Sequence, residues 1–270
     1  MTVGFIGAGQ LGEPMVTRLL GADHEVLVYA RREDLRGRLR DRGATLAESI
    51  AEVAAASDIL IGCLFSDAQL RQTGLGTAGF IANAKPGSVF VSHTTGSPNT
   101  LTELAESSES APVILDAPVS GSAEDIVAGA LTILIGGDSA AVAAVHPVLA
   151  AYANPIIPTG ELGSALRVKL INNLLFAANA QLTTSAVLVG EQLGVAPDAL
   201  LRALLACSGS SRAAVLMEHV GGPDEFGRNA APFLRKDVAV AVANAEEFGV
   251  DLGLLASVAL AGPLPLAVTA

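Results

Sequence analysis

The chain has 270 residues, of which 51% are hydrophobic and 16% are charged. This composition is typical of a folded protein with a substantial core, and it excludes the polar, charge-rich make-up of disordered chains. The formal net charge of −11 argues against a nucleic-acid-binding protein, since neutralising phosphates requires clustered lysine and arginine. No apolar run reaches the ~18 residues of a membrane-spanning helix, and no basic segment precedes the first predicted strand, so we expect a cytoplasmic protein without a membrane partner.

The N-terminal segment combines a predicted strand, a glycine-rich loop and a predicted helix. A β-prone run at 2–6 meets the sequence GAGQLG, and helical spacing follows it. In the pattern G-x-G-x-x-G, Gly7 permits a tight turn, Gly9 lets a pyrophosphate approach the backbone, and Gly12 lets the helix pack closely on the strand. We predict that a dinucleotide cofactor binds to this loop, which comprises Gly7, Ala8, Gly9, Gln10, Leu11 and Gly12. The alternative is a purely structural turn.

The residues after the next β-prone run, at 25–29, distinguish the two nicotinamide cofactors. An acidic residue there would bind the ribose 2′-hydroxyl of NAD, whereas arginine would pair with the 2′-phosphate of NADP. The chain has VYARRED, so Arg31 and Arg32 favour NADP, with NAD as the alternative. These two begin a segment with six arginines between residues 31 and 42, where we expect a local anion site. A different explanation is that the arginines only begin a solvated helix.

Further β-prone runs at 58–64, 88–91, 113–115 and 131–135 alternate with helical stretches or turns. This alternation predicts an α/β domain of the Rossmann type, with a parallel sheet and helices on both faces. Ligands bind at the carboxyl ends of such strands, which draws attention to the loops SHTTGSP and DAPVSGSAED. In the second loop, Ser120, Gly121 and Ser122 offer hydroxyl and backbone N–H groups to an anionic substrate, unless Gly121 serves only as a turn.

The character of the sequence changes at about residue 160, where strand-like runs end and long apolar helical stretches begin. We therefore predict a dinucleotide-binding domain over 1–160 and an all-helical domain over 161–270. A helix at about 162–193 would be ~45 Å long and would connect the two halves. Because its apolar residues surround it on most sides, we expect a partner subunit to cover it.

Lys169 lies within this predicted helix, and Asn172 and Asn173 follow at the two spacings that share its face. An ammonium among leucine and isoleucine side chains loses hydration, which lowers its pKa and suits a group that exchanges a proton near neutral pH. The alternative is a lysine that reaches solvent from the helix edge or pairs with a carboxylate.

The cysteine and histidine residues do not suggest a metal site. Cys63 lies in an apolar run and Cys207 in the loop-like CSGSS, and we expect both to be free thiols. The remaining histidines outside the candidate loops show no ligand spacing, and we interpret them as surface or loop residues: His24, His146 and His219.

Five motifs, in this order, are similar to those of a known family: GFIGAGQLGEPM, KPGSVFVSHTTGSP, LDAPVSGSAEDIVAGALTILIGG, GSALRVKLINN and FLRKD. Together they resemble the β-hydroxyacid dehydrogenases, the family of hydroxyisobutyrate dehydrogenase and of the glyoxylate and succinic semialdehyde reductases. The resemblance covers nearly the whole chain. It implies a phosphogluconate dehydrogenase-like fold and NAD(P)-dependent hydride transfer between a short-chain β-hydroxy acid and the corresponding keto or semialdehyde acid. It also implies a homodimer, or a dimer-based tetramer, formed around the long helix.

The resemblance also implies roles for individual residues. Lys169 would be the catalytic acid and base, and Asn173 would orient the lysine and the substrate. Ser120 with Gly121 would hold the substrate carboxylate, beside Ser122. Cofactor contacts are implied for Leu64, for Thr95 near the nicotinamide ribose, and for Lys236.

The chain departs from the family pattern at three positions near the expected active site. Ser92 replaces the usual acidic residue of the D-x-S-T stretch and is followed by His93, while Ser122 replaces a second glycine. These changes concern the substrate more than the reaction, and we expect Ser122, His93 and the loop at 207–212 to line the pocket.

Two other functions fit parts of the sequence. One is an imine reductase on the same scaffold, and the other is a non-catalytic NADP-binding sensor. Lys169 favours hydroxy-acid chemistry over imine reduction, and the lysine together with Asn172 and Asn173 favours a catalyst over a sensor.

Overall fold

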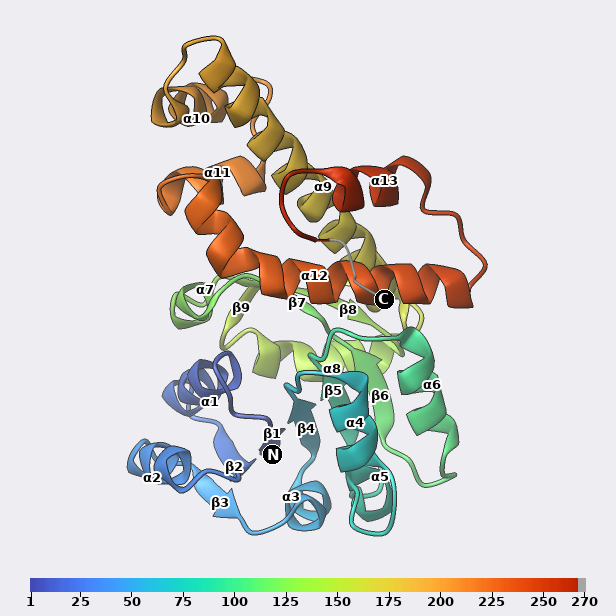
Figure 1. Cartoon of the computed structure of the whole chain (residues 1–270). Coiled ribbons are helices and arrows are strands. Elements are labelled where there is room, and N and C mark those ends of the chain that lie inside the picture. Colours follow the sequence, from blue (N-terminus) through green and yellow to red (C-terminus); the bar gives the residue numbers. More distant parts are fainter. Residues whose placement is uncertain (267–270) are drawn as a thin grey trace. The chain divides into compact units, whose positions relative to one another are not determined.

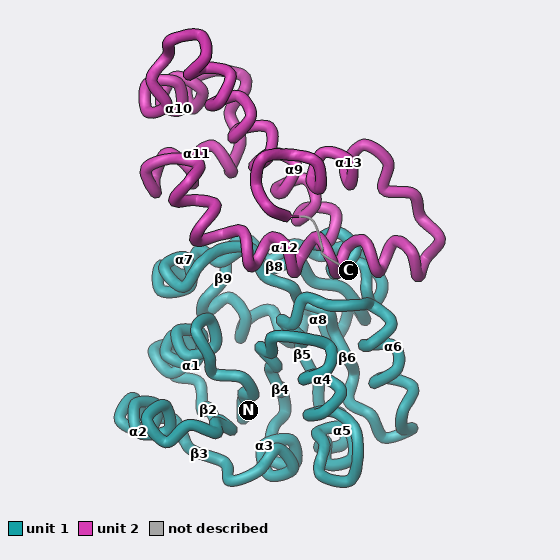
Figure 2. Tube along the Cα trace, viewed as in Figure 1, with its two compact units in different colours: residues 1–169 teal, residues 170–270 magenta. Residues whose placement is uncertain are grey.

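The structure is a computed structural model that describes residues 1–266 (Figure 1). The chain forms two compact units, which divide between Lys169 and Leu170 (Figure 2). We call them unit 1 and unit 2. The expected domain boundary, at 160/161, lies before the long helix, whereas the units divide inside it. The reason is that Leu166 in the first part of this helix belongs to a core cluster of unit 1, while Leu170 and Leu174 belong to the core of unit 2.

Unit 1 contains a nine-stranded sheet of order β3-β2-β1-β4-β5-β6-β8-β7, with β9 also paired to β8. Its strands are β1 (Thr2–Ile6), β2 (Glu25–Tyr29), β3 (Thr45–Ala47), β4 (Ile59–Gly62), β5 (Val89–Ser92), β6 (Val113–Asp116), β7 (Val119–Ser120), β8 (Leu131–Gly136) and β9 (Ala153–Gly160). Strands β1 to β6 are parallel in the order 3-2-1-4-5-6, which is that of dinucleotide-binding folds. The predicted Rossmann-type α/β domain is thus confirmed, with antiparallel pairing added where β8 meets β6 and β7.

Helices cover both faces of this sheet. They are α1 (Gly12–Gly21), α2 (Glu33–Asp41), α3 (Ile50–Ala56), α4 (Asp67–Gly74), α5 (Phe80–Asn83), α6 (Pro98–Glu106), α7 (Ala123–Val127) and α8 (Ser139–Leu149). Successive side chains of a strand point to opposite faces. Accordingly Phe5 packs in one core cluster with residues of α1, α2 and α8, whereas Ile6 packs in the other with residues of α3, α4 and α6.

The predicted strands at 2–6 and 25–29 are confirmed with the same bounds, and the other four are confirmed within two residues. Three further strands, β3, β7 and β9, were not predicted. Strand β9 contains Pro155 and Pro158, which lack the N–H that an interior strand needs. It tolerates them because, within the described chain, it pairs with β8 alone.

Unit 2 is helical. The long helix α9 (Ser164–Gln192) enters it from unit 1, and α10 (Pro197–Ala206), α11 (Arg212–His219), α12 (Pro223–Glu247) and α13 (Gly253–Ala261) follow. Its core includes Leu174 of α9, Met217 of α11 and Val238 of α12. The buried Gln181 is fully hydrogen-bonded, since its amide group donates to the carbonyls of Ala259 and Leu264. None of the helices within residues 1–266 has the length and apolar character needed to cross a lipid bilayer.

Candidate active site

The glycine loop after β1 has the geometry that a pyrophosphate site requires. Gly7 has φ of +92°, and its carbonyl accepts a 2.7 Å hydrogen bond from the Gly9 N–H, which closes a tight turn. No heavy atom lies within 4 Å of the position that a Cβ of Gly9 would take, so a ligand can approach the backbone there. A Cβ on Gly12 would meet the Gly7 carbonyl and the ring of Phe5, because α1 packs closely against β1. The loop therefore fits a dinucleotide pyrophosphate at the N-terminus of α1.

Three loops lie at the same edge of the sheet, at the carboxyl ends of β1, β4 and β5. The Cys63 N–H donates to the Ile6 carbonyl over 2.9 Å, which joins the end of β4 to the glycine loop. The Leu64 N–H donates to the Thr94 hydroxyl over 3.3 Å, which joins the β4 loop to the β5 loop. The half-buried Leu64 and Thr95, both expected to contact the cofactor, thus lie in neighbouring loops at the edge that carries the glycine loop.

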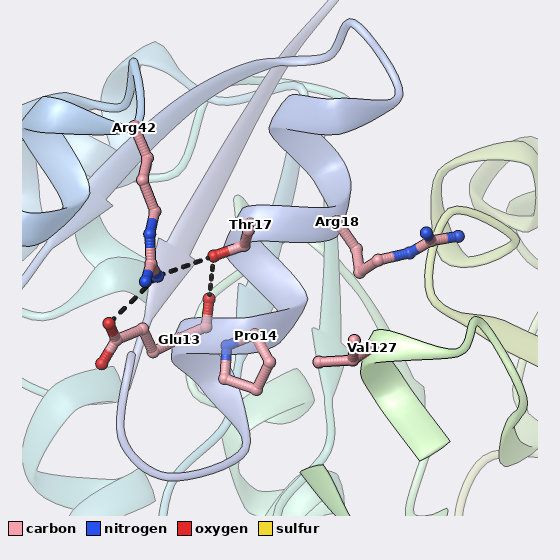
Figure 3. A pocket seen from close by; sticks show the side chains of 6 residues that line it. All are labelled: Glu13, Pro14, Thr17, Arg18, Arg42 and Val127. Atoms are coloured by element: carbon pink, nitrogen blue, oxygen red, sulfur yellow. Dashed lines mark hydrogen bonds and ion pairs between the residues drawn. The ribbon is translucent and has the colours of Figure 1, made fainter. Parts of the chain in front are cut away.

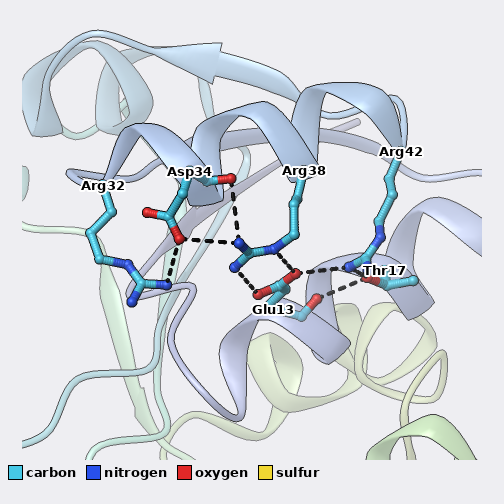
Figure 4. A network of polar contacts seen from close by, with 6 residues as sticks. All are labelled: Glu13, Thr17, Arg32, Asp34, Arg38 and Arg42. Atoms are coloured by element: carbon cyan, nitrogen blue, oxygen red, sulfur yellow. Dashed lines mark hydrogen bonds and ion pairs between the residues drawn. The ribbon is translucent and has the colours of Figure 1, made fainter.

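Arg38 of α2 and Arg42, directly after its end, link this helix to the first turns of α1 (Figure 4). Arg38 binds the Glu13 carboxylate through two nitrogens, at 2.9 and 2.8 Å. Arg42 donates to the same carboxylate at 3.1 Å and to the Thr17 hydroxyl at 3.0 Å. Hydrogen bonding to Arg38 holds the pKa of Glu13 below its usual value. These contacts fix the packing of α2 on α1 next to the glycine loop.

The arginine segment is therefore not one anion site of six members, which corrects the expectation from the sequence. Besides Arg38 and Arg42, Arg36 is held by the Glu48 carboxylate, at 2.6 Å. Arg31 and Arg32, by contrast, are exposed directly after β2. The Arg32 guanidinium lies 3.5 Å from a carboxylate two residues later in the chain.

A surface hollow of about 320 Å³ lies beside the outer face of α1 (Figure 3). Its walls are formed by Glu13, Pro14, Thr17, Arg18, Arg42 and Val127. None of the glycine-loop residues lines it. We therefore assign it to the packing of α1 against α2 and α7, where the Arg42 contacts form one wall, and not to the cofactor site.

The loop after β6 contains the candidate carboxylate-binding residues. Gly121 has φ of +142°, a conformation that side chains rarely adopt, so the interpretation as a turn residue accounts for this glycine by itself. Ser122 is the N-cap of α7: its hydroxyl accepts the Asp125 N–H at 3.3 Å, and the Asp125 carboxylate accepts the Ser122 N–H at 2.6 Å. The hydroxyl of Ser122 is thus engaged in helix capping. Ser120 lies at the end of β7 and is half-buried.

His93 does not line a pocket, contrary to expectation, because its ring is enclosed in the core of unit 1. Its side chain is 4% exposed. Nδ1 lies 2.5 Å from the Ala117 carbonyl, which can only accept, so Nδ1 carries the proton and Nε2 accepts from the Tyr152 hydroxyl at 2.8 Å. Burial lowers the pKa of His93 to about 4. Tyr152 is 59 residues from His93 in the chain, so no local sequence pattern predicts this hydrogen bond.

Asp116, the last residue of β6, is a buried carboxylate that was not among the predicted site residues. Its two oxygens accept the N–H groups of Gly163 and Leu166, each at 2.8 Å, at the start of α9. Burial raises the pKa of Asp116, and the backbone N–H groups that it accepts oppose that rise. The available signal was an acidic residue that directly ends the apolar run VIL.

Three polar residues of α9 share one side of the helix. Lys169 is half-buried, and Asn172 and Asn173 follow at the spacings that share its face. Asn173 is buried, donates its amide to the Asp237 carboxylate at 3.0 Å, and accepts from the Asn172 amide at 3.2 Å. Lys236 of α12 lies 3.4 Å from the same Asp237 carboxylate. Asp237 was not predicted as a site residue, although it belongs to the motif FLRKD.

Among residues 1–266, no three His, Cys, Asp or Glu side chains gather in a way that could hold a metal ion. Cys63 and Cys207 are both free thiols, and Cys207 is exposed.

Two family models together cover most of the chain. Residues 2–161 match the model described as the NAD binding domain of 6-phosphogluconate dehydrogenase. Residues 163–261 match the model described as NAD-binding of NADP-dependent 3-hydroxyisobutyrate dehydrogenase.

Relatives with assigned names are similar over almost the full length. The chain is 30% identical over 257 residues to 2-(hydroxymethyl)glutarate dehydrogenase of Eubacterium barkeri, which covers 94% of the chain and 85% of the relative. It is 30% identical over 269 residues to a probable mitochondrial 3-hydroxyisobutyrate dehydrogenase of Arabidopsis thaliana, with 92% and 77% covered.

Solved structures share the fold. The structure of 3-hydroxyisobutyrate dehydrogenase of Mycobacterium tuberculosis with L-serine superposes with a TM-score of 0.85 and 26% identity, covering 96% of this chain and 91% of that one. An imine reductase from Pseudomonas sp. superposes with a TM-score of 0.62 and 18% identity over 95% and 90% of the two chains. At that identity, the second similarity concerns the fold alone.

Proposed function

The chain belongs to the β-hydroxyacid dehydrogenase family and is an NAD(P)-dependent oxidoreductase, and from this premise we propose that Lys169 is its general acid and base. The proposed reaction interconverts a short-chain β-hydroxy acid and the corresponding keto or semialdehyde acid. The observation that carries the proposal is a half-buried lysine, on a helix whose start is anchored at the carboxyl edge of the sheet, followed on the same face by a hydrogen-bonded asparagine.

The residues of unit 1 fit a nicotinamide dinucleotide. The glycine loop at Gly7–Gly12 would hold the pyrophosphate, while Leu64 and Thr95 from the neighbouring loops would contact the nicotinamide half. From unit 2 we assign Lys236 to the cofactor as well. When bound, the nicotinamide supplies or accepts the hydride.

The chain's own groups handle the proton and the substrate. In the direction of reduction, the Lys169 ammonium gives a proton to the carbonyl oxygen, and in oxidation the amine takes a proton from the hydroxyl. Asn173 presents an amide of fixed orientation, because Asp237 and Asn172 hold its two ends. We assign the substrate carboxylate to the Ser120 hydroxyl and the Gly121 N–H, with Ser122 shaping the turn. Carboxylate recognition of this kind positions the carbonyl carbon before transfer.

The decisive experiment follows NADPH absorbance with glyoxylate, succinic semialdehyde, short β-keto acids and cyclic imines, for the parent and two variants. Lys169→Ala should lose ~10²–10⁴ in kcat, because a positioned proton donor typically contributes that much. Lys169→Arg keeps the charge but not the proton exchange, and should lose almost as much. NADPH affinity, measured by fluorescence titration, should change little in either variant.

Three results would change the proposal. A Lys169→Ala variant as active as the parent would remove the lysine from the mechanism. Turnover of cyclic imines alone would favour an imine reductase. Tight NADPH binding without oxidation or reduction of any compound in the panel would favour a sensor.

We further propose NADP as the preferred cofactor. The support is the pair of exposed cations, Arg31 and Arg32, that follows β2 in place of an acidic residue. The KM for NADPH should be lower than that for NADH, and the Arg31→Ala, Arg32→Ala double variant should lose most of the difference. Arg40→Ala, at an exposed arginine of the same segment, is the matched control and should leave the ratio unchanged. An unaltered ratio in the double variant would contradict the preference.

We also propose a homodimer formed along α9. Large apolar side chains on this helix are exposed and recur at spacings of four and seven residues: Ile171, Leu175, Leu182 and Val189, with the exposed Leu193 directly after the end of the helix. Leu182 is 56% exposed. Exposed apolar side chains that recur along one side of a helix in this way are typical of a helix that packs against another chain.

A further inference from the structure

The start of α9 is held to the sheet by one buried carboxylate. Asp116 is 0% exposed, and its Oδ1 and Oδ2 accept the N–H groups of Gly163 and Leu166 at 2.8 Å each. These N–H groups belong to the end of a helix that has no intrahelical acceptor for them and that carries the positive end of the helix dipole. Hydrogen bonds in which the acceptor is charged are roughly twice as strong as neutral ones. Asp116 thus links the end of strand β6 to the first turn of α9 through two charge-assisted hydrogen bonds.

Two N–H groups three residues apart fix more than the distance between helix and strand. Gly163 and Leu166 lie at different points of the first turn of α9. Because Asp116 binds the N–H groups of both, it fixes the rotation of α9 about its axis as well as its position along that axis. Lys169 follows Leu166 by three residues, or ~4.5 Å along the axis. The position of the Lys169 side chain therefore depends on the two hydrogen bonds that Asp116 accepts.

The Asp116 carboxylate is closely packed by its neighbours. A Cβ on Gly136 would come within 2.5 Å of Asp116 Oδ1 and 2.6 Å of the Ser164 hydroxyl, so β8 approaches this junction as closely as glycine permits. Leu166 itself is 1% exposed, in the core of unit 1. Because the junction is packed this closely, we expect the loss of a hydrogen bond within it to shift the start of the helix.

Asp116 also stands in the chain segment that carries the proposed substrate-binding residues. Strand β6 ends at Asp116 and is followed four residues later by Ser120, whose strand β7 pairs with β8. The same short segment thus connects Ser120 to Asp116, which binds the first turn of the helix that carries Lys169.

We propose that Asp116 is a positioning residue for the reaction: by holding the first turn of α9, it places the Lys169 amine relative to the loop that carries Ser120. This proposal rests on the function proposed above for Lys169. A displacement of about 1 Å in a catalytic group costs up to ~10²-fold in rate. Asp116→Asn turns one accepting oxygen into an NH₂ group that faces a backbone N–H, so one of the two bonds is lost while the volume of the side chain is kept.

The test compares Asp116→Asn with a matched control, Asp138→Asn. Asp138 is the N-cap of α8 in the same unit, and its carboxylate accepts the Ala141 N–H at 2.8 Å. Asp116→Asn should lower kcat by ~10–100-fold, with the KM of the substrate and the Kd of NADPH each changed less than about threefold. Asp138→Asn removes the same charge from a helix start but keeps an oxygen that accepts the Ala141 N–H, so it should weaken the protein slightly without that loss of kcat. A loss confined to kcat separates positioning from a general weakening of the fold, which the control would share.

A second readout does not depend on catalysis. Hydrogen exchange measured by mass spectrometry should show faster exchange of the amides at 163–169 in Asp116→Asn, and unchanged exchange there in Asp138→Asn. Gly136→Ala is the second variant: it keeps the carboxylate but pushes a methyl group into the junction, and should repeat both effects even if Asp116→Asn does not fold.

The outcomes separate this inference from the proposed function. Two results would overturn the positioning role. One is amide exchange at 163–169 that is no faster than in the parent in both Asp116→Asn and Gly136→Ala. The other is an undiminished kcat in variants whose exchange at 163–169 has increased. If the parent is active and Lys169→Ala keeps full turnover, the proposed function fails at the lysine, whereas the exchange experiment still decides whether Asp116 anchors the helix.

Discussion

Replacing Tyr152 by phenylalanine is a direct test of the buried His93 pair. The Tyr152 side chain is 0% exposed, and its hydroxyl donates to His93 Nε2 over 2.8 Å. Because His93 Nδ1 donates to the Ala117 carbonyl, the ring cannot turn to find another donor for Nε2 without losing that bond. Tyr152→Phe removes one oxygen atom and leaves the ring packing intact. The buried acceptor His93 Nε2 then has no donor.

The cost follows from burial on both sides of the bond. A buried group left without its hydrogen-bond partner costs ~1–3 kcal/mol. For a protein of this size, 1 kcal/mol corresponds to a shift in Tm of ~2–4 °C. We therefore expect the Tm of Tyr152→Phe to fall by roughly 2–12 °C, with the midpoint of urea unfolding lowered in proportion.

Thermal unfolding followed by circular dichroism measures the change, and the only other tyrosine provides the control. Tyr29 is half-buried at the end of β2, and Tyr29→Phe should shift Tm by much less. Combining Tyr152→Phe with His93→Leu should cost less than the sum of the single changes, because removing both partners leaves no unsatisfied group. An unchanged Tm in Tyr152→Phe, or strict additivity in the double variant, would refute this account of the pair.

Three further outcomes are expected. Below its ordinary pKa of 6.5, His93 takes up a proton in the unfolded chain but, with its pKa lowered to about 4, not in the folded one. Its contribution is therefore complete at pH 7 and falls by ~2 kcal/mol at pH 5, a loss that urea titrations should find smaller in His93→Gln. Gly12→Ala should weaken NADPH binding at least ~10-fold, because the methyl group meets the Gly7 carbonyl and the glycine loop must move; Gly21→Ala, with open space around it, should not. If the proposed dimer forms along α9, Leu182→Glu should convert it to monomers in sedimentation experiments, whereas Leu254→Glu, on the exposed face of α13, should leave it intact.

Local patterns in the sequence were sufficient for the cofactor loop and the parallel sheet. Strand β1, the glycine loop and α1 follow one another within about 20 residues, and two of the glycines have a local reason there: Gly7 has a positive φ, and Gly12 contacts Gly7 and Phe5. The period of apolar residues likewise predicted β2, β4, β5, β6 and β8, and the long helix α9 within two residues of its observed bounds. The families matched over 2–161 and 163–261 confirm the enzyme class that five ordered motifs indicated.

Contacts between distant segments decided the rest. His93 was expected in a pocket, but Tyr152 and the Ala117 carbonyl enclose it, and only the tertiary fold brings Tyr152, which lies between α8 and β9, next to the residue that follows β5. Arg38 looked like part of an anion site until packing of α2 on α1 gave it the Glu13 carboxylate.

The grip of Asp116 on α9 crosses 47 and 50 residues of sequence, and strand β9 tolerates its prolines only because it stands at an edge. A polar or charged side chain takes its role from the partner that burial leaves to it. Periodicity reports which face of an element is buried, whereas the partner on the other side of that interface is set by the tertiary fold.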